Sequence, residues 1–134
     1  MNKYELNERE QFLAKKIVEA AILVHRVLGP GLLEKVYEIC IAHVLMKQGI
    51  KVVRQTIVPV KFMDLEIKNA LRLDLLVDDC IIVEVKAAET VHPIWQAQIL
   101  SQLKLTGNNI GFLLNFNVTL MKDGIRRFSF NHNK

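Results

Sequence analysis

Several residue types that mark particular classes of protein are scarce in this chain. It has two cysteines, Cys40 and Cys80, without CxxC spacing, which argues against a disulfide framework and predicts two reduced, buried thiols. Its four histidines are scattered without the spacing of zinc ligands. It has only two serines and no GxSxG sequence, which argues against the nucleophile motif of serine hydrolases. The phosphate-binding patterns GxxxxGKS/T and GxGxxG are also absent.

No stretch of the sequence has the length and apolarity of a membrane span. The longest uninterrupted apolar runs fall well short of the roughly 20 residues that cross a bilayer. The start of the chain is polar and of mixed charge, unlike a signal peptide. Together with the reduced thiols, these features predict a cytoplasmic protein that does not bind membranes.

The composition is that of a single globular domain. The chain has 134 residues, of which 51% are hydrophobic and 24% are charged, and this length suits one hydrophobic core. We therefore expect one domain that spans residues 1–134. The formal net charge of +4 is compatible with a polyanionic partner such as nucleic acid, but it excludes few alternatives.

Three segments have the apolar periodicity of helices, at about residues 7–28, 32–48 and 93–106. Asn7 is placed to cap the first helix, with Glu10 at the position of a capping box. Gly29-Pro30-Gly31 stops that helix. Pro93 suits the first turn of the third helix.

Five segments read as strands, at about residues 51–62, 67–77, 80–87, 109–115 and 125–130. Pro59 places the first strand at a sheet edge or at a bulge. The fourth strand follows a helix, so we expect it to pair parallel to an earlier strand through a right-handed crossover. The order ααβββαββ predicts an α/β (α+β) fold in which helices flank a mixed sheet.

The strand at 80–87 carries Glu84 and Lys86, two charged residues among β-branched neighbours that point to the same face. Burying either charge costs free energy unless it has a partner. Asp74 lies on the preceding strand. A tight turn centred between Asp78 and Asp79 would place Asp74 opposite Val83, whereas a bulge would shift the register by one and bring Asp74 beside Glu84. The sequence leaves both registers open.

Two carboxylates a few ångströms apart repel unless a proton or a cation lies between them. A hard divalent ion with oxygen ligands, Mg²⁺ or Mn²⁺, would resolve that conflict. Lys86 could then position an attacking water or stabilise charge on a phosphate. The alternative is an exposed row of ion pairs with a solvated Asp74, and the apolar neighbours of Glu84 argue against full exposure.

At this point the chain resembles a known family. Asp74 followed by Glu84-Val85-Lys86 resembles the D…ExK signature of the PD-(D/E)xK nuclease superfamily, and Gly31 to Tyr37 matches the Gly-x-x-Glu-x-x-Tyr motif of the GxxExxY protein family. The segments Leu28-Gly29-Pro30, Arg72-Leu73-Asp74 and Leu103-Lys104 also fit that family, as does Gln98. The resemblance extends from about Ile17 to Phe130.

The resemblance implies a restriction-endonuclease-like core with a central four-stranded mixed sheet. It implies metal ligation by Asp74, Glu84, the backbone carbonyl of Val85, and Glu34, and a role for Lys86 at the water or the phosphate. Without the resemblance, Glu34 is explained as an acid in the first turn of a helix, where the dipole favours it. Gln98 would reach the site from the third helix.

Five residues are predicted to contact nucleic acid: Arg72, Trp95, Gln102, Arg126 and Arg127. Gln102 stands where relatives often carry tyrosine, four residues after the glutamine, which puts that contact in doubt. A lone tryptophan is also explained by core packing, and an arginine pair by a solvated strand end.

Together these features predict a nuclease that uses Mg²⁺ or Mn²⁺ and hydrolyses DNA in preference to RNA. The alternative is a module on the same fold that binds nucleic acid or protein without cleavage. A homodimer is plausible, because cleavage of two strands calls for two sites.

Overall fold

The computed structural model describes residues 4–132, and its element order confirms the predicted ααβββαββ arrangement and α/β fold class. A short 3₁₀ helix, which the sequence did not indicate, precedes the last strand. The elements are α1 (Glu8–Leu28), α2 (Glu34–Lys47), β1 (Val52–Phe62), β2 (Leu65–Val77), β3 (Ile81–Lys86), α3 (Ile94–Thr106), β4 (Ile110–Asn115), η1 (Met121–Gly124) and β5 (Ile125–Ser129).

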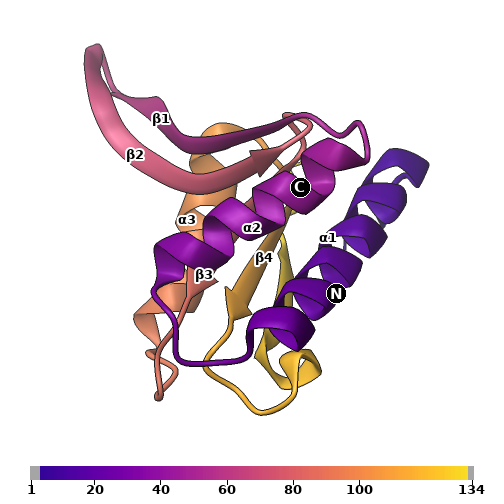
Figure 1. The fold of residues 1–134 in the computed structure, drawn as a ribbon. Coiled ribbons are helices and arrows are strands. Elements are labelled where there is room, and N and C mark those ends of the chain that lie inside the picture. The colour runs from indigo at the N-terminus through magenta and orange to yellow at the C-terminus, as the bar shows by residue number, and fades with distance from the viewer. Residues whose placement is uncertain (1–3, 133–134) are drawn as a thin grey trace.

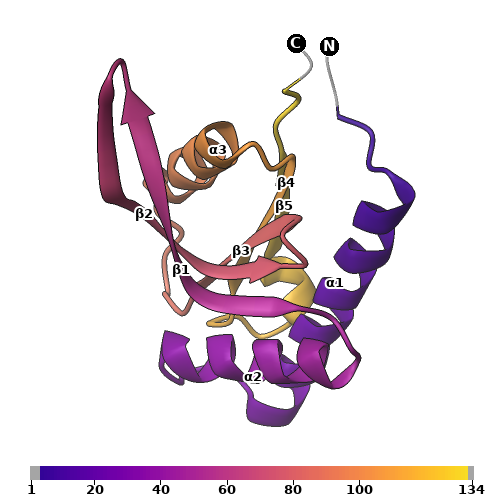
Figure 2. The same cartoon turned by 90° about the horizontal axis from the view of Figure 1, so that it is seen from above.

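The sheet has five strands in the order β1-β2-β3-β4-β5, so the four-stranded sheet implied by the resemblance is wrong by one strand. β3 and β4 pair parallel, as expected for a crossover through α3, and the other neighbours pair antiparallel. α1 and α2 cover one face and α3 covers the other (Figures 1 and 2). This arrangement is consistent with a restriction-endonuclease-like core.

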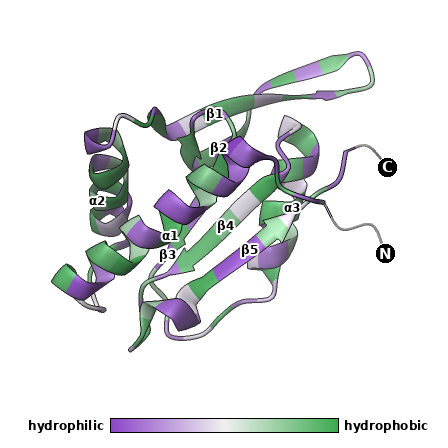
Figure 3. Ribbon diagram, turned by 90° about the vertical axis from the view of Figure 1, so that its right-hand side faces the viewer, coloured by the Kyte–Doolittle hydropathy of each residue, from purple (hydrophilic) through white to green (hydrophobic). Residues whose placement is uncertain are grey.

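β3 and β4 form the buried centre of the sheet. Every residue of β4 is buried, and so is every residue of β3 except Lys86. β4 is coloured mostly hydrophobic, whereas β5 at the edge carries a hydrophilic stretch (Figure 3). A central strand covered on both faces must be apolar on both faces, which explains the continuous apolar runs. Glu84 is the exception within β3, because it is charged and only 8% exposed.

The helix ends largely follow the sequence signals. The Asn7 side chain accepts a hydrogen bond from the Glu10 N–H at 2.8 Å, and Glu10 Oε1 accepts one from the Asn7 N–H at 3.0 Å, which confirms the capping box. α2 begins at Glu34, two residues later than expected, because Leu33 adopts an extended backbone as its N-cap. Glu34 is therefore the first residue of the helix.

β1 and β2 extend beyond the rest of the sheet as a long hairpin arm (Figures 1 and 2). The β1–β2 register shifts between Val58 and Val60, so Pro59 marks a bulge on the edge strand, as predicted. Cys40 and Cys80 are free and half-buried, less buried than expected. In residues 4–132, no helix combines the length and apolarity that a bilayer span requires.

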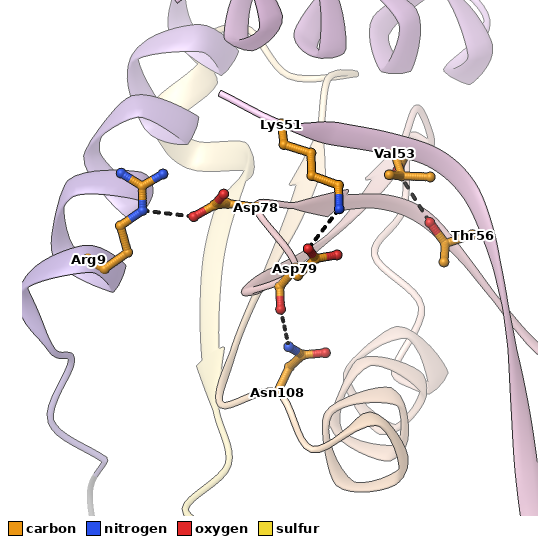
Figure 4. Close-up of polar contacts among 7 residues, drawn as sticks. All are labelled: Arg9, Lys51, Val53, Thr56, Asp78, Asp79 and Asn108. Atoms are coloured by element: carbon orange, nitrogen blue, oxygen red, sulfur yellow. Dashed lines mark hydrogen bonds and ion pairs between the residues drawn. The ribbon is translucent and has the colours of Figure 1, made fainter. Parts of the chain in front are cut away.

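The turn between β2 and β3 decides the register of the two strands. Asp78 and Asp79 both have φ +53, and the Cys80 N–H donates to the Val77 carbonyl at 2.9 Å. Cys80 thus belongs to the turn, and Val77 pairs with Ile81. Ion pairs of 2.8 Å from Arg9 and Lys51 to the two aspartates, and a hydrogen bond of 3.1 Å from the Asn108 amide to the Asp79 carbonyl, brace the turn (Figure 4).

This turn settles the question that the sequence left open. Leu75 pairs with Val83, so continuing the register places Asp74 opposite Glu84. The symmetric hairpin, which would place Asp74 opposite Val83, is wrong by one residue. The register shifted by one residue is confirmed.

Candidate active site

Asp74 and Glu84 lie side by side where β2 and β3 begin to separate. The Asp74 N–H donates to Glu84 Oε2 at 3.0 Å, and the Val85 N–H donates to Asp74 Oδ2 at 2.9 Å. Each carboxylate therefore binds the backbone of the opposite strand, beyond the last paired residues of the two strands, Leu75 and Val83. These bonds fix both carboxylates and commit only one oxygen of each.

Burial and mutual repulsion make this carboxylate pair costly. Burial, followed by the negative charge of Asp74, raises the pKa of Glu84 from 4.5 to about 7. Burial also raises the pKa of Asp74, against the effect of the hydrogen bond from Val85, and the charge of Glu38 raises it further. Lys86 lowers the pKa of both carboxyls without cancelling either shift.

Lys86 projects toward the start of α3. Its Nζ lies 5.5 Å from the centroid of the Trp95 ring, a cation–π contact. Trp95 therefore contacts the lysine of the predicted site. Gln102, from the same helix, stabilises the ionised form of Glu84 and lowers its pKa. Within residues 4–132, Gln102 Oε1 is buried without a hydrogen-bond partner.

α2 brings Glu34 to the end of β3. Its Oε2 accepts a hydrogen bond of 3.3 Å from the Ala87 N–H, just after Lys86. The buried Tyr37 holds the loop that precedes α2, because its hydroxyl donates to the Gly29 carbonyl at 2.6 Å and accepts from the Leu32 N–H at 3.1 Å. The glutamate of the Gly-x-x-Glu-x-x-Tyr motif thus contacts the site, and the tyrosine positions the helix that carries it.

Two cavities meet at these residues, and Arg72 lines both of them. The α3-side cavity, of about 450 Å³, is lined by Glu84, Lys86, Gln98 and Gln102 among others. The α2-side cavity, of about 310 Å³, is lined by Glu34, Lys35, Glu38, Arg54, Gln55, Arg72 and Asp74. The structure thus brings Arg72, Gln98 and Gln102, which the sequence predicted, to the carboxylate pair.

Arg126 and Arg127 line neither of these two cavities. Both lie on β5, at the opposite edge of the sheet from the arm. The Arg126 guanidinium stacks 5.0 Å from the centroid of the Phe128 ring, and Arg127 lines a separate cavity beside α1.

Sequence reasoning missed a second cluster, which lines the α2-side cavity. Glu38 is only 5% exposed, and its carboxylate binds Arg54 Nη2 at 2.8 Å and Gln55 Nε2 at 2.8 and 2.9 Å. One sequence signal was available, because Glu38 stands next to Tyr37 in the buried stripe of α2, where an unpaired charge is rare. The sequence could not show which residues pair with it.

The donors at this site fit a hard divalent ion. The backbone hydrogen bonds to Asp74 and Glu84 use one carboxylate oxygen of each, and Gln102 adds a side-chain hydrogen bond to Glu84. Mg²⁺ is commonly held by one or two carboxylates with several waters. A cation there would oppose the repulsion that raises the pKa of Glu84. Within residues 4–132, no three His, Cys, Asp or Glu side chains lie close enough together to hold a metal, so ligation by Glu34 stays a prediction.

Comparison with protein-family models identifies the superfamily to which the chain belongs. The protein-family model described as the PD-(D/E)XK nuclease superfamily matches residues 11–128, most of the chain. No curated protein and no solved structure matches the chain.

Proposed function

The chain belongs to the PD-(D/E)XK nuclease superfamily, and we propose that it is a metal-dependent nuclease that hydrolyses phosphodiester bonds in nucleic acid, with DNA as the preferred substrate. The observation that carries the proposal is the register of β2 and β3, which sets Asp74 beside a buried Glu84 of raised pKa. We also propose that the chain is a member of the GxxExxY family within this superfamily. In support, Glu34 of that motif binds the Ala87 N–H at the end of β3, and Tyr37 binds the Gly29 carbonyl in the loop before α2.

Each residue of the site has a distinct proposed role. Asp74, Glu84 and the backbone carbonyl of Val85 would hold Mg²⁺ or Mn²⁺, and Glu34 would hold the ion or its water. The ion would supply Lewis acidity and lower the pKa of a bound water. The Lys86 ammonium, oriented by the Trp95 ring, would stabilise negative charge on the phosphate.

The walls of the cleft would bind the nucleic-acid strand. Gln98 and Gln102 line the α3-side cavity, and Arg72 lines both cavities. Trp95 contributes through its contact with Lys86. The homodimer and the cytoplasmic location stay predictions, and the mass of the purified protein in solution tests the first of them.

Cleavage assays test the proposal. Labelled single-stranded, double-stranded and branched DNA, and RNA, are incubated with Mg²⁺ or Mn²⁺ and the wild type, Asp74→Asn or Lys86→Ala. Lys47→Ala is a matched lysine control, because Lys47 is exposed at the end of α2 and lies outside the two cavities. We expect both site variants to lose cleavage and the control to keep it.

A different outcome would favour the non-cleaving module. Wild-type protein that binds DNA with equal affinity in EDTA and in Mg²⁺, and cleaves none of the substrates, would contradict the nuclease proposal. Cleavage that survives in Asp74→Asn would show that another site performs the reaction.

A further inference from the structure

We propose that Arg54, with Arg72 and Lys35, forms a second phosphate-binding subsite in the α2-side cavity, which holds a backbone phosphate of the nucleic-acid strand next to the phosphate that is cleaved. The inference rests on the proposed function and adds to it how the strand is held. Three cationic side chains line this cavity together with Asp74.

The buried carboxylate of Glu38 holds the Arg54 guanidinium in place through an ion pair. Its Nη2 binds Glu38 Oε2 at 2.8 Å, and the same carboxylate accepts two hydrogen bonds from the Gln55 amide. Glu38 is 5% exposed, whereas the Arg54 side chain keeps 34% of its surface open. An arginine held in this way loses less side-chain entropy when its remaining donors bind a phosphate, and its planar fork suits that ligand.

The backbone at Gln55 is distorted in a way that serves this cluster. Consecutive residues of a strand point to opposite faces, yet Arg54 and Gln55 both reach Glu38. Gln55 has φ +55, a left-handed conformation that is unfavourable for a residue other than glycine. Because Arg54 pairs with Leu75, Gln55 lies across from Asp74. The distortion thus stands directly opposite a predicted metal ligand, where backbone strain is often functional.

The charges of the cavity make phosphate binding depend on the metal. Lys35, Arg54 and Arg72 are balanced by the carboxylates of Glu34, Glu38 and Asp74. The cavity therefore has little net attraction for an anion until a divalent ion binds beside Asp74. We expect Mg²⁺ to tighten DNA binding, and part of the gain to require Arg54.

The test measures binding of a labelled single-stranded oligonucleotide by fluorescence anisotropy, as a function of salt. The protein is the 134-residue chain with Lys86→Ala, measured with Mg²⁺, so that the strand stays intact. Loss of one phosphate contact lowers the slope of log K against log[salt] by about 0.7 for single strands. We expect Arg54→Gln to show this change and to bind several-fold more weakly at low salt, with Arg54→Lys largely restoring the slope.

Arg26→Gln is the matched control, because Arg26 is an exposed arginine in the last turn of α1 and lies outside the two cavities. Arg54→Gln leaves Glu38 buried without its cation, so the double variant Glu38→Gln/Arg54→Gln is measured beside it to remove that charge. Thermal melts confirm that each variant is folded.

The outcomes separate this inference from the nuclease proposal. If Arg54→Gln and the double variant Glu38→Gln/Arg54→Gln both keep the salt slope of the parent protein, the subsite is overturned. This holds even if the wild type cleaves DNA through Asp74 and Lys86. A reduced slope in the Arg54 variants with an unchanged slope in Arg26→Gln supports it. No binding by the parent protein with Mg²⁺ overturns the subsite, and no cleavage by the wild type then contradicts the nuclease proposal as well.

Discussion

Replacing Glu84 by glutamine should make the metal-free protein more stable at neutral pH. The pKa of Glu84 rises from 4.5 in its ordinary state to about 7 in the fold. Between these values the folded protein binds a proton more readily than the unfolded chain, so stability falls as pH rises through this window. Above pH 7 the full penalty applies, and a shift of this size corresponds to about 3 kcal/mol.

Glu84→Gln removes the ionisation and keeps the size of the side chain and an oxygen that can accept from the Asp74 N–H. We expect the free energy of unfolding in EDTA to rise by about 3 kcal/mol at pH 8, roughly 10 °C in Tm for a domain of this length. The gain should shrink through pH 6 and vanish below about pH 4.5, the ordinary value. Urea denaturation at three pH values measures it.

Glu66→Gln serves as the control, since Glu66 is exposed on the hairpin arm and should change stability little at any pH. Adding Mg²⁺ should stabilise the wild type more than Glu84→Gln, because a ligand that binds only the folded state raises its stability by mass action. A Glu84→Gln protein that is less stable than the wild type at pH 8 in EDTA would refute the reasoning.

Two further variants test how the cleft is assembled. Tyr37→Phe removes the hydroxyl that binds the Gly29 carbonyl and the Leu32 N–H. Thermal melts should show that the free energy of unfolding falls by about 1–3 kcal/mol. The rate of cleavage should fall by more than the fraction of protein that is unfolded at the assay temperature. Trp95→Leu removes the cation–π contact with Lys86, which is worth about 0.5–1 kcal/mol at a partly exposed site. It should lower kcat a few-fold with an unchanged Tm, and an unchanged kcat would show that the tryptophan does not orient the lysine.

The sequence predicted the elements well because their signals are local. Glycines and prolines mark where helices end, and Pro59 lies at the bulge that it indicated. The register of β2 and β3 was not predictable, because it depends on whether Cys80 belongs to the turn. Asp78-Asp79-Cys80 is compatible with either turn length, and the positive φ of both aspartates also fits the shorter, two-residue turn. The pairing of Val77 with Ile81, which leaves Cys80 unpaired, decides between them.

Some residues of the candidate site were likewise predictable from local sequence signals, and others were not, because they depend on tertiary contacts. Glu84 and Lys86 were visible as charges inside an apolar strand, which is a local signal. Arg54 and Glu38 come into contact only because β1 packs on α2, which is a tertiary contact. The residues around Gln55 give no sequence signal for its left-handed backbone conformation. The predicted nucleic-acid contact of Arg127 stays a prediction, and its strand lies at the edge of the sheet away from the hairpin arm.

Unfavourable features of the structure gather at one place. Among residues 4–132, four residues other than glycine have positive φ, and three of them form turns, so Gln55 alone has this conformation inside a strand. The two buried, unpaired side-chain atoms in that range, Arg54 Nε and Gln102 Oε1, belong to residues that line the two cavities. Glu84, with its raised pKa, lines the α3-side cavity together with Gln102. Each feature costs about 1–3 kcal/mol, and costs of this kind cluster at functional sites. Their position around one carboxylate pair argues that the cleft was kept for its chemistry.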